Sequence, residues 1–274
     1  MPYLGLVVLS LILTVFSWRK TGSLRFLPFH LCLSGLVFVF DFVVFVLLDS
    51  YRYTPRLVKD PWFDGVLGGI ASDGFIVPAA GVFLTVYRIG WPGMAAAALA
   101  FMGIEILFLS LGVYADNWWN VLYTGLSLPV FFLIARWIWR LIRCRMDRAL
   151  PRFLILYFVN LTLQFSLVFL YTSLLGALHY RLPWFADVSR GHIVFINLCV
   201  LADSLLFAGA AAAGVRRMGL FVITGILLAV NLLLFKYGLI RTPLVTNLLG
   251  LTLVQAASLF LLTAFRRLLT PRSS

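Results

Sequence analysis

The chain has 274 residues, of which 62% are hydrophobic and only 12% are charged, and its mean hydropathy is +1.02. Soluble domains carry about twice that share of charged residues, so the composition excludes an ordinary soluble globular protein. The net charge of +12 would suggest a nucleic-acid ligand in a soluble protein, but here the cations stand at the ends of apolar runs. Membrane topology and anionic lipid headgroups explain such cations better than nucleic acid does.

Apolar runs of membrane-spanning length recur along the whole chain. In chain order, they cover residues 2–18, 26–48, 64–87, 91–114, 118–142, 152–177, 192–213, 218–236 and 243–265. Backbone groups in hydrocarbon must pair internally, so runs of this length favour helices. The sequence therefore predicts an all-α fold, a polytopic transmembrane helix bundle of about nine helices. The first run has no basic leader and no small-residue cleavage motif, which favours a retained first helix.

The distribution of Lys and Arg predicts the orientation of the helices. With the N-terminus outside, 15 of the 22 Lys and Arg residues fall at cytoplasmic ends, and the C-terminus is cytoplasmic. The longest internal polar break covers residues 136–152. It predicts a five-helix half, residues 1–145, and a four-helix half, residues 146–274, within one membrane domain. No convincing internal repeat relates the two halves at the level of sequence.

Four acidic residues fall inside predicted spans: Asp41, Asp73, Glu105 and Asp203. A central carboxylate costs about 2.5–3.5 kcal/mol on insertion scales, so such residues face a protein interior or a cavity and are functional candidates. At 1.5 Å of rise per residue, the first three lie about 10–14 Å below the outer surface, and Asp203 lies near the midplane. Their similar depth predicts one polar site. Alternatively, some of these acids pair with a buried amide or tyrosine and fix the packing of helices.

Other residues are candidates to complete this site. Glu105 is the predicted catalytic acid, with Asp73 or Asp203 as its partner, since paired carboxylates in an apolar setting retain a proton near neutral pH. We expect the substrate to contact Asp41, Phe38, Asn160, Gln164, Trp118 and Trp119. Phe38 shares a helix face with Asp41, and Asn160 and Gln164 share a face at i and i+4. The two tryptophans stand at a predicted outer boundary, where lipid contact is the alternative interpretation.

Pro78 follows Asp73 by five residues inside the third predicted span. A proline removes a helical hydrogen bond and clashes with the preceding turn, so it predicts a kink with a free carbonyl near residue 74. An exposed carbonyl beside a carboxylate would add to the polar site.

Sequence motifs for cofactors and metals are absent. The chain has no Walker A motif, GxGxxG, H-E-x-x-H, D-D-x-x-D or G-x-S-x-G. We therefore expect no cofactor and no metal. The three cysteines, Cys32, Cys144 and Cys199, are widely spaced and fit buried apolar positions better than disulfides.

Several stretches in the first half resemble a family of small five-helix membrane proteins from Gram-positive spore formers. They are YRYTPRL (51–57), SDGFIVP (72–78), an isolated Glu105, GVYADNWWN (112–120) and ARWIWRLIR (135–143). The resemblance covers roughly residues 15–145, and this chain departs from the family by adding four helices. It implies a bacterial source and a helical fold, but no activity. We expect the protein to be a multi-pass protein of the bacterial cytoplasmic membrane.

Three classes of function remain open. The first is an intramembrane acid catalyst acting on an apolar, isoprenoid-like substrate; in chemistry and size it is similar to transmembrane terpene cyclases, without a shared motif. The second is a small proton-coupled transporter, which intramembrane acids and a Pro-interrupted helix also suit. The third is a non-catalytic sensor or assembly module. The predicted partners are anionic lipid headgroups at the cytoplasmic face and an apolar small molecule, with no nucleic acid and an oligomeric state that the sequence leaves open.

Overall fold

The structure, a computed structural model, describes residues 2–182, 184–215, 217–242 and 244–269. Within these residues, nine helices are long and apolar enough to cross a membrane, which confirms the predicted all-α polytopic fold. The chain forms two compact units, Met1–Arg145 and Met146–Ser274.

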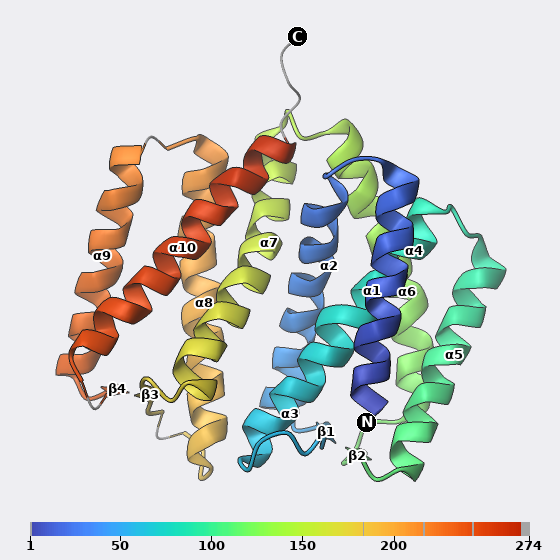
Figure 1. The fold of residues 1–274 in the computed structure, drawn as a ribbon, viewed down its shortest axis with the longest axis horizontal. Helices are drawn as coiled ribbons and strands as arrows, with labels where there is room; N and C mark the ends of the chain where they lie inside the picture. Colours follow the sequence, from blue (N-terminus) through green and yellow to red (C-terminus); the bar gives the residue numbers. More distant parts are fainter. Residues whose placement is uncertain (1, 183, 216, 243, 270–274) are drawn as a thin grey trace. The chain divides into compact units, whose positions relative to one another are not determined.

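The first unit contains five of the spanning helices and one small β-ladder (Figure 1). Its elements are α1 (Pro2–Thr21), α2 (Phe26–Asp41), the π-helix η1 (Phe42–Leu47), β1 (Tyr51–Tyr53), α3 (Pro61–Gly69), the π-helix η2 (Ile70–Ile76), α4 (Val77–Val86), α5 (Trp91–Ser110), β2 (Tyr114–Asp116) and α6 (Val121–Cys144). Elements α3, η2 and α4 form one continuous span. Strands β1 and β2 pair antiparallel, with Tyr53 opposite Tyr114.

The second unit contains the other four spanning helices and a second small ladder (Figure 1). Its elements are α7 (Ala149–Phe169), the π-helix η3 (Leu170–Leu174), β3 (His179–Tyr180), α8 (Val188–Ala213), α9 (Arg217–Lys236), β4 (Ile240–Arg241) and α10 (Thr246–Leu269). Strands β3 and β4 pair antiparallel, with Tyr180 opposite Ile240.

The second unit repeats the element order that the first unit shows from α2 onward. In both, a helix ends in a π-helical turn and is followed by a strand, two helices, a second strand and a last helix. The helices that follow the first strand have 26, 20 and 24 residues in the first unit. Their counterparts in the second unit have the same 26, 20 and 24 residues. The two units are therefore built on one repeated plan, which the sequence comparison of the halves did not reveal.

The connections repeat as closely as the helices do. Three pairs of residues with positive φ occupy equivalent turns: Asp49 and Gly176, Arg88 and Gly214, Gly112 and Gly238. The hydrogen bonds around them also match. The amide of Val113 donates to the carbonyl of Phe108, and the amide of Leu239 donates to that of Leu234, five residues back in each case. This is the Schellman end of a helix, which favours glycine at the left-handed position.

Local sequence explains where the third span starts and why β1 packs against it. The Asp60 side chain accepts hydrogen bonds from the amides of Trp62 and Phe63 and so caps α3, while Pro61 stands at the first turn. Gly68 permits a close approach, because a Cβ atom there would lie 2.4 Å from the Cβ of Tyr53. The absence of a side chain at Gly68 thus allows β1 to pack directly against the helix.

Pro78 lies in the first turn of α4, directly after the π-helix η2. The buried carbonyl of Gly74 accepts a hydrogen bond of 2.8 Å from the hydroxyl of Ser34 on α2. The carbonyl near residue 74 is thus used to join two helices, and the sequence expectation of an exposed carbonyl is wrong. The physical reason is that a freed carbonyl in an apolar interior needs a donor, and Ser34 supplies one.

Candidate functional site

The first unit encloses an apolar cavity of about 390 Å³. Its wall comes mainly from α2, α5 and α6, and the strands β1 and β2 contribute tyrosines. The aromatic rings of the wall, apart from the tyrosines, are Phe40, Phe101, Phe108, Trp119 and Phe131. Three carboxyl groups also line this cavity, those of Asp41, Asp73 and Glu105. Three acids that the sequence placed at a similar depth therefore meet in one space.

Asp41 and Asp73 form a close carboxyl pair. Both side chains are buried, and the two carboxyl groups lie within hydrogen-bonding distance of each other. The Tyr51 hydroxyl donates to Asp41 Oδ1 at 2.6 Å, and the Tyr53 hydroxyl donates to Asp73 Oδ2 at 2.7 Å. The Ser72 hydroxyl donates to Asp73 Oδ1 at 3.3 Å. Two carboxylates so close together in an apolar setting would repel each other, so the pair is suited to hold one proton between them.

Both members of the pair stand at π-helical turns. Asp41 is the last residue of α2, immediately before η1, and Asp73 lies within η2. A π-helical turn inserts an extra residue per turn and is found most often at functional sites. Here the two wide turns bring two carboxyl groups from different spans within hydrogen-bonding distance.

The tyrosines of the β1–β2 ladder cover the side of the pair that faces the ladder. Burial raises the pKa of Tyr51 and of Tyr53 well above the ordinary value of 10, and the nearby aspartates raise both further. Burial raises the pKa of Tyr114 as well, with a smaller contribution from Glu105. The three phenols therefore stay protonated at physiological pH, and two of them, Tyr51 and Tyr53, donate hydrogen bonds to the carboxyl pair.

Glu105 approaches the cavity from α5. Its Oε1 atom is buried without a hydrogen-bond partner among the described residues. The Thr124 hydroxyl lies beside the carboxyl and accepts a hydrogen bond of 3.0 Å from the indole of Trp119. A buried carboxyl oxygen without a donor is unusual in a folded protein and is available to a molecule in the cavity.

The cavity reaches the surface of the unit between α2 and α6. Phe40 on α2 and Val130 and Ile134 on α6 line the cavity and are exposed, Val130 by 56%. These exposed side chains mark the place where the cavity opens at the surface of the unit.

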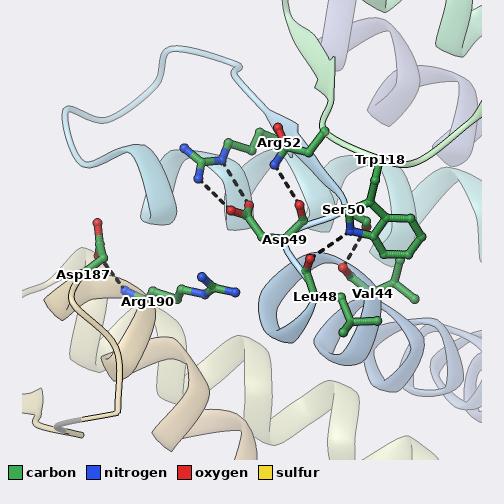
Figure 2. Close-up of polar contacts among 9 residues, drawn as sticks. Val44, Leu48, Asp49, Ser50, Arg52, Trp118, Asp187 and Arg190 are labelled. Atoms are coloured by element: carbon green, nitrogen blue, oxygen red, sulfur yellow. Dashed lines mark hydrogen bonds and ion pairs between the residues drawn. The ribbon is translucent and has the colours of Figure 1, made fainter.

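Two of the predicted contact residues in the first unit lie outside the cavity lining. Phe38 packs against Gly74, where a Cβ atom would lie 2.9 Å from its ring. Trp118 is exposed, and its indole donates a hydrogen bond to the carbonyl of Leu48 at the outer turn (Figure 2). In the same turn Asp49 forms an ion pair of 2.9 Å with Arg52 (Figure 2). Trp118 thus belongs to the turn that carries β1, while its neighbour Trp119 lines the cavity.

The remaining predicted residues lie in the second unit. The Asn160 amide donates a hydrogen bond of 2.9 Å to the hydroxyl of Ser204. Asp203 accepts a hydrogen bond of 2.8 Å from Gln255, whose Oε1 accepts one from Asn231. Gln164 is fully buried, and its side-chain N and O have no hydrogen-bond partner in the described part of the chain. Asp203 therefore belongs to an amide network between α8, α9 and α10.

The second unit also contains a histidine beside a serine. His192 accepts a hydrogen bond at Nδ1 from the amide of Tyr180, so its proton stands on Nε2, which faces the Ser173 hydroxyl at 3.0 Å. A protonated nitrogen cannot remove the proton of the serine, so this pair is unsuited to nucleophilic catalysis. Across residues 2–269, as far as they are described, no cluster of three His, Cys, Asp or Glu fits a metal ion.

Comparison with protein-family models, curated proteins and solved structures finds no match for this chain. The repeated plan of the protein supplies an internal comparison instead. The matching helix lengths and turns align the positions of Asp41, Asp73 and Glu105 with Val168, Val200 and Asn231 in the second unit. All three of those side chains are buried. The second unit therefore packs the same arrangement of helices without a carboxyl group at any of the three positions.

Sequence reasoning missed Tyr51 and Tyr53 as site residues. The signal was present in the Y-R-Y alternation at residues 51–53, because alternate residues of a strand point to the same side. Hydropathy did not predict this strand, because a three-residue strand between two spans gives no hydropathy signal.

Proposed function

We propose that the protein is an intramembrane acid catalyst that protonates an apolar, isoprenoid-like substrate. The observation that supports this most is the comparison of the two units. One unit builds the repeated fold with valine and asparagine, while the other has three carboxyl groups at the same positions, two of them buried. Buried carboxyl groups cost free energy, and the fold does not require them there, so we attribute them to chemistry.

The proposed reaction begins at the carboxyl pair. The proton shared by Asp41 and Asp73 moves to the terminal carbon of an alkene, or to the oxygen of an epoxide. The π electrons of the alkene form the new C–H bond, or the C–O bond of the epoxide breaks, and a carbocation results. Internal attack by a second double bond closes a ring, and loss of one proton from carbon ends the sequence. One proton enters and one leaves, so the reaction is an isomerisation that needs no cofactor.

Different residues of the cavity have different roles in the proposed reaction. The Tyr51 and Tyr53 hydroxyls stabilise the carboxylate that remains after proton donation, since each already donates to one aspartate. The aromatic wall stabilises positive charge through the faces of its rings. Glu105, with a free oxygen in the same cavity, is placed to accept the proton that is lost at the end and to return it to the aspartate pair, which restores the catalyst for the next turnover.

The experiment uses purified protein in lipid nanodiscs with linear polyprenoid alkenes and their terminal epoxides. In D₂O, a cyclised product of alkene protonation carries one deuterium on carbon, because the acidic proton exchanges with solvent. Mass spectrometry detects both the product and the label. Asp73→Asn should lower the rate about 10²–10⁴-fold, and Asp147→Asn, an exposed residue outside the cavity, should leave it unchanged. Absence of any product, or equal rates in both variants, would refute the proposal.

A second function, proton-coupled transport, is favoured by one observation. Many carriers consist of two structural repeats, and the two units here share one plan. A carboxyl pair that gains and loses a proton would couple substrate movement to pH. Reconstituted protein should then show substrate flux that follows an imposed pH gradient and disappears in Asp73→Asn, with no change in the chemical identity of the substrate.

A further inference from the structure

A second cavity of the first unit is strongly cationic. It measures about 950 Å³ and lies at the helix ends opposite the β1–β2 ladder. Its basic side chains are Lys20, Arg25, Arg88, Arg136, Arg140 and Arg143. No acidic residue lines it, and in the described part of the chain none of the six forms an ion pair. Six like charges around one hollow repel each other, and a bound anion would relieve that repulsion.

Parts of this cavity are held in place by contacts within the unit. The Arg136 guanidinium donates a hydrogen bond to the carbonyl of Ile89, which fixes α6 against the turn between α4 and α5. The Lys20 ammonium lies 5.7 Å from the centre of the Tyr87 ring. The Thr85 hydroxyl, which also lines the cavity, is buried with no partner among the residues that the structure describes. A donor left free next to cations suits an anionic oxygen.

The backbone at Arg88 gives an independent reason to regard this cavity as a site. Arg88 has φ 54°, in the left-handed region that favours glycine. Its amide donates to the carbonyl of Thr85, and the amide of Ile89 donates to that of Leu84. Gly214 occupies the same place in the second unit with φ 76°, and the hydrogen bonds around it have the same pattern. The first unit thus carries an arginine at a turn where its own counterpart has glycine.

We propose that this cavity binds a phosphate-bearing group with two or more negative charges, either a phosphomonoester or a diphosphate. Arginine forks match phosphate oxygens, and several of them around one hollow suit more than a single negative charge. The sequence predicts that this end of the unit faces the cytoplasm, where anionic lipids are concentrated. Positive-inside topology alone would place cations near helix ends, but it explains neither their convergence on one cavity nor Arg88. This inference is independent of the proposed catalysis.

The test compares two double variants that remove equal charge from the same end of the unit. Arg88→Gly/Arg140→Gln removes two cations of the cavity. Arg19→Gln/Arg145→Gln removes two exposed cations that do not line it. Each protein is placed in phosphatidylcholine nanodiscs, and affinity is derived from the rise in melting temperature with added ligand. The ligands are phosphatidic acid within the nanodisc and inorganic pyrophosphate in solution.

The cavity variant should bind about 25-fold more weakly than the unchanged protein, since each basic residue near an anionic surface contributes about fivefold. The control variant should differ by less than about threefold. Binding of phosphatidic acid alone identifies a lipid headgroup as the source of the anion, and binding of pyrophosphate identifies a soluble one; both uphold the proposal. Binding of neither ligand, or equal loss in both double variants, would overturn it.

The single variant Arg88→Gly separates a binding role from a structural one. Glycine suits the left-handed turn, so the melting temperature without ligand should stay the same or rise. Affinity should fall about fivefold in the same protein. A lower melting temperature with unchanged affinity would show that Arg88 serves the turn, and the proposal would fail.

Discussion

Replacing Asp73 by Asn or by Ala separates the chemical role of the carboxyl pair from its role in the fold. The carboxyl group accepts hydrogen bonds from Tyr53 and Ser72 and is linked to that of Asp41. An asparagine has nearly the same shape. Its amide group donates to Asp41, and its carbonyl oxygen still accepts from Tyr53. An alanine provides neither contact, so the Tyr53 hydroxyl stays buried without its acceptor, and Asp41 keeps only the hydrogen bond from Tyr51.

The expected magnitudes differ clearly between the two variants. A buried polar group that loses its partner costs about 1–3 kcal/mol, so Asp73→Ala should destabilise the protein by about 2–6 kcal/mol. Asp73→Asn retains the contacts and should cost less than about 1 kcal/mol. An amide cannot donate a proton to carbon, so Asp73→Asn should still lose the catalytic rate by about 10²–10⁴-fold.

The assay measures unfolding in mixed micelles with increasing denaturing detergent, together with product formation from polyprenoids in nanodiscs. Tyr53→Phe serves as a second probe, since it removes only the hydroxyl that donates to Asp73. If Asp73→Asn were as destabilising as Asp73→Ala, the carboxyl group itself would be needed to hold the helices together. If Asp73→Asn folded and kept its activity, the pair would not supply the proton.

Three further predictions follow from particular contacts. Because Tyr51 and Tyr53 have raised pKa values in the folded protein, the unfolded chain loses these protons at a lower pH. The contribution of these tyrosines to the free energy of unfolding should therefore be constant below pH 10 and fall above it by about 1.4 kcal/mol per pH unit for each tyrosine. Phenolate absorbance should show both tyrosines ionising only as the protein unfolds, and ionisation before unfolding would contradict this prediction. Gly68→Ala should lower the free energy of unfolding by about 1–3 kcal/mol, because the new Cβ would lie 2.4 Å from the Cβ of Tyr53. Gly103→Ala is the control: a Cβ there has no atom within 4 Å, so the substitution should be neutral or stabilising in the same unfolding assay. Asp203→Asn should leave product formation unchanged, because Asp203 bonds to Gln255 and does not line the acid cavity; a large loss of rate would place Asp203 in the chemistry after all.

The membrane spans were predictable from the sequence because hydrocarbon imposes a local requirement on every helix. Each observed span begins and ends within about four residues of its predicted run. Two spans start three or four residues early because a capping residue extends the helix beyond its apolar run. Pro61 follows the cap Asp60, and Val188 follows the cap Asp187, whose side chain accepts from the amide of Arg190 (Figure 2). Hydropathy detects apolar runs only, so it does not predict the extra helical residues that follow a polar capping residue.

The candidate site was predictable in part. Depth along each helix placed Asp41, Asp73 and Glu105 at one level, and these three do share a cavity. Depth says nothing about rotation around the helix axis, so it also could not exclude Phe38 or Trp118. Asp41 directly precedes the π-helical turn η1, and Asp73 lies within η2. Such turns are set by packing between helices, and the sequence of one segment does not encode them.

The repeated plan was hidden from the sequence because turn geometry, and not residue identity, preserves it. Asp49 and Arg88 take the left-handed conformation that Gly176 and Gly214 take in the second unit. In a sequence alignment these pairs are mismatches. In three dimensions they mark the same turn, and each substitution of glycine accepts some strain in the backbone.

These departures from the repeated plan point to two functional regions of the first unit. At one end Asp49 pairs with Arg52 in the strand that carries Tyr51 and Tyr53, so the turn holds the donors of the carboxyl pair. At the other end Arg88 lines the cationic cavity. The second unit forms the same two turns with Gly176 and Gly214, so the turns themselves require neither Asp49 nor Arg88. The strain at both turns is therefore best explained by what each side chain supports, the acid pair at one end of the unit and an anion at the other.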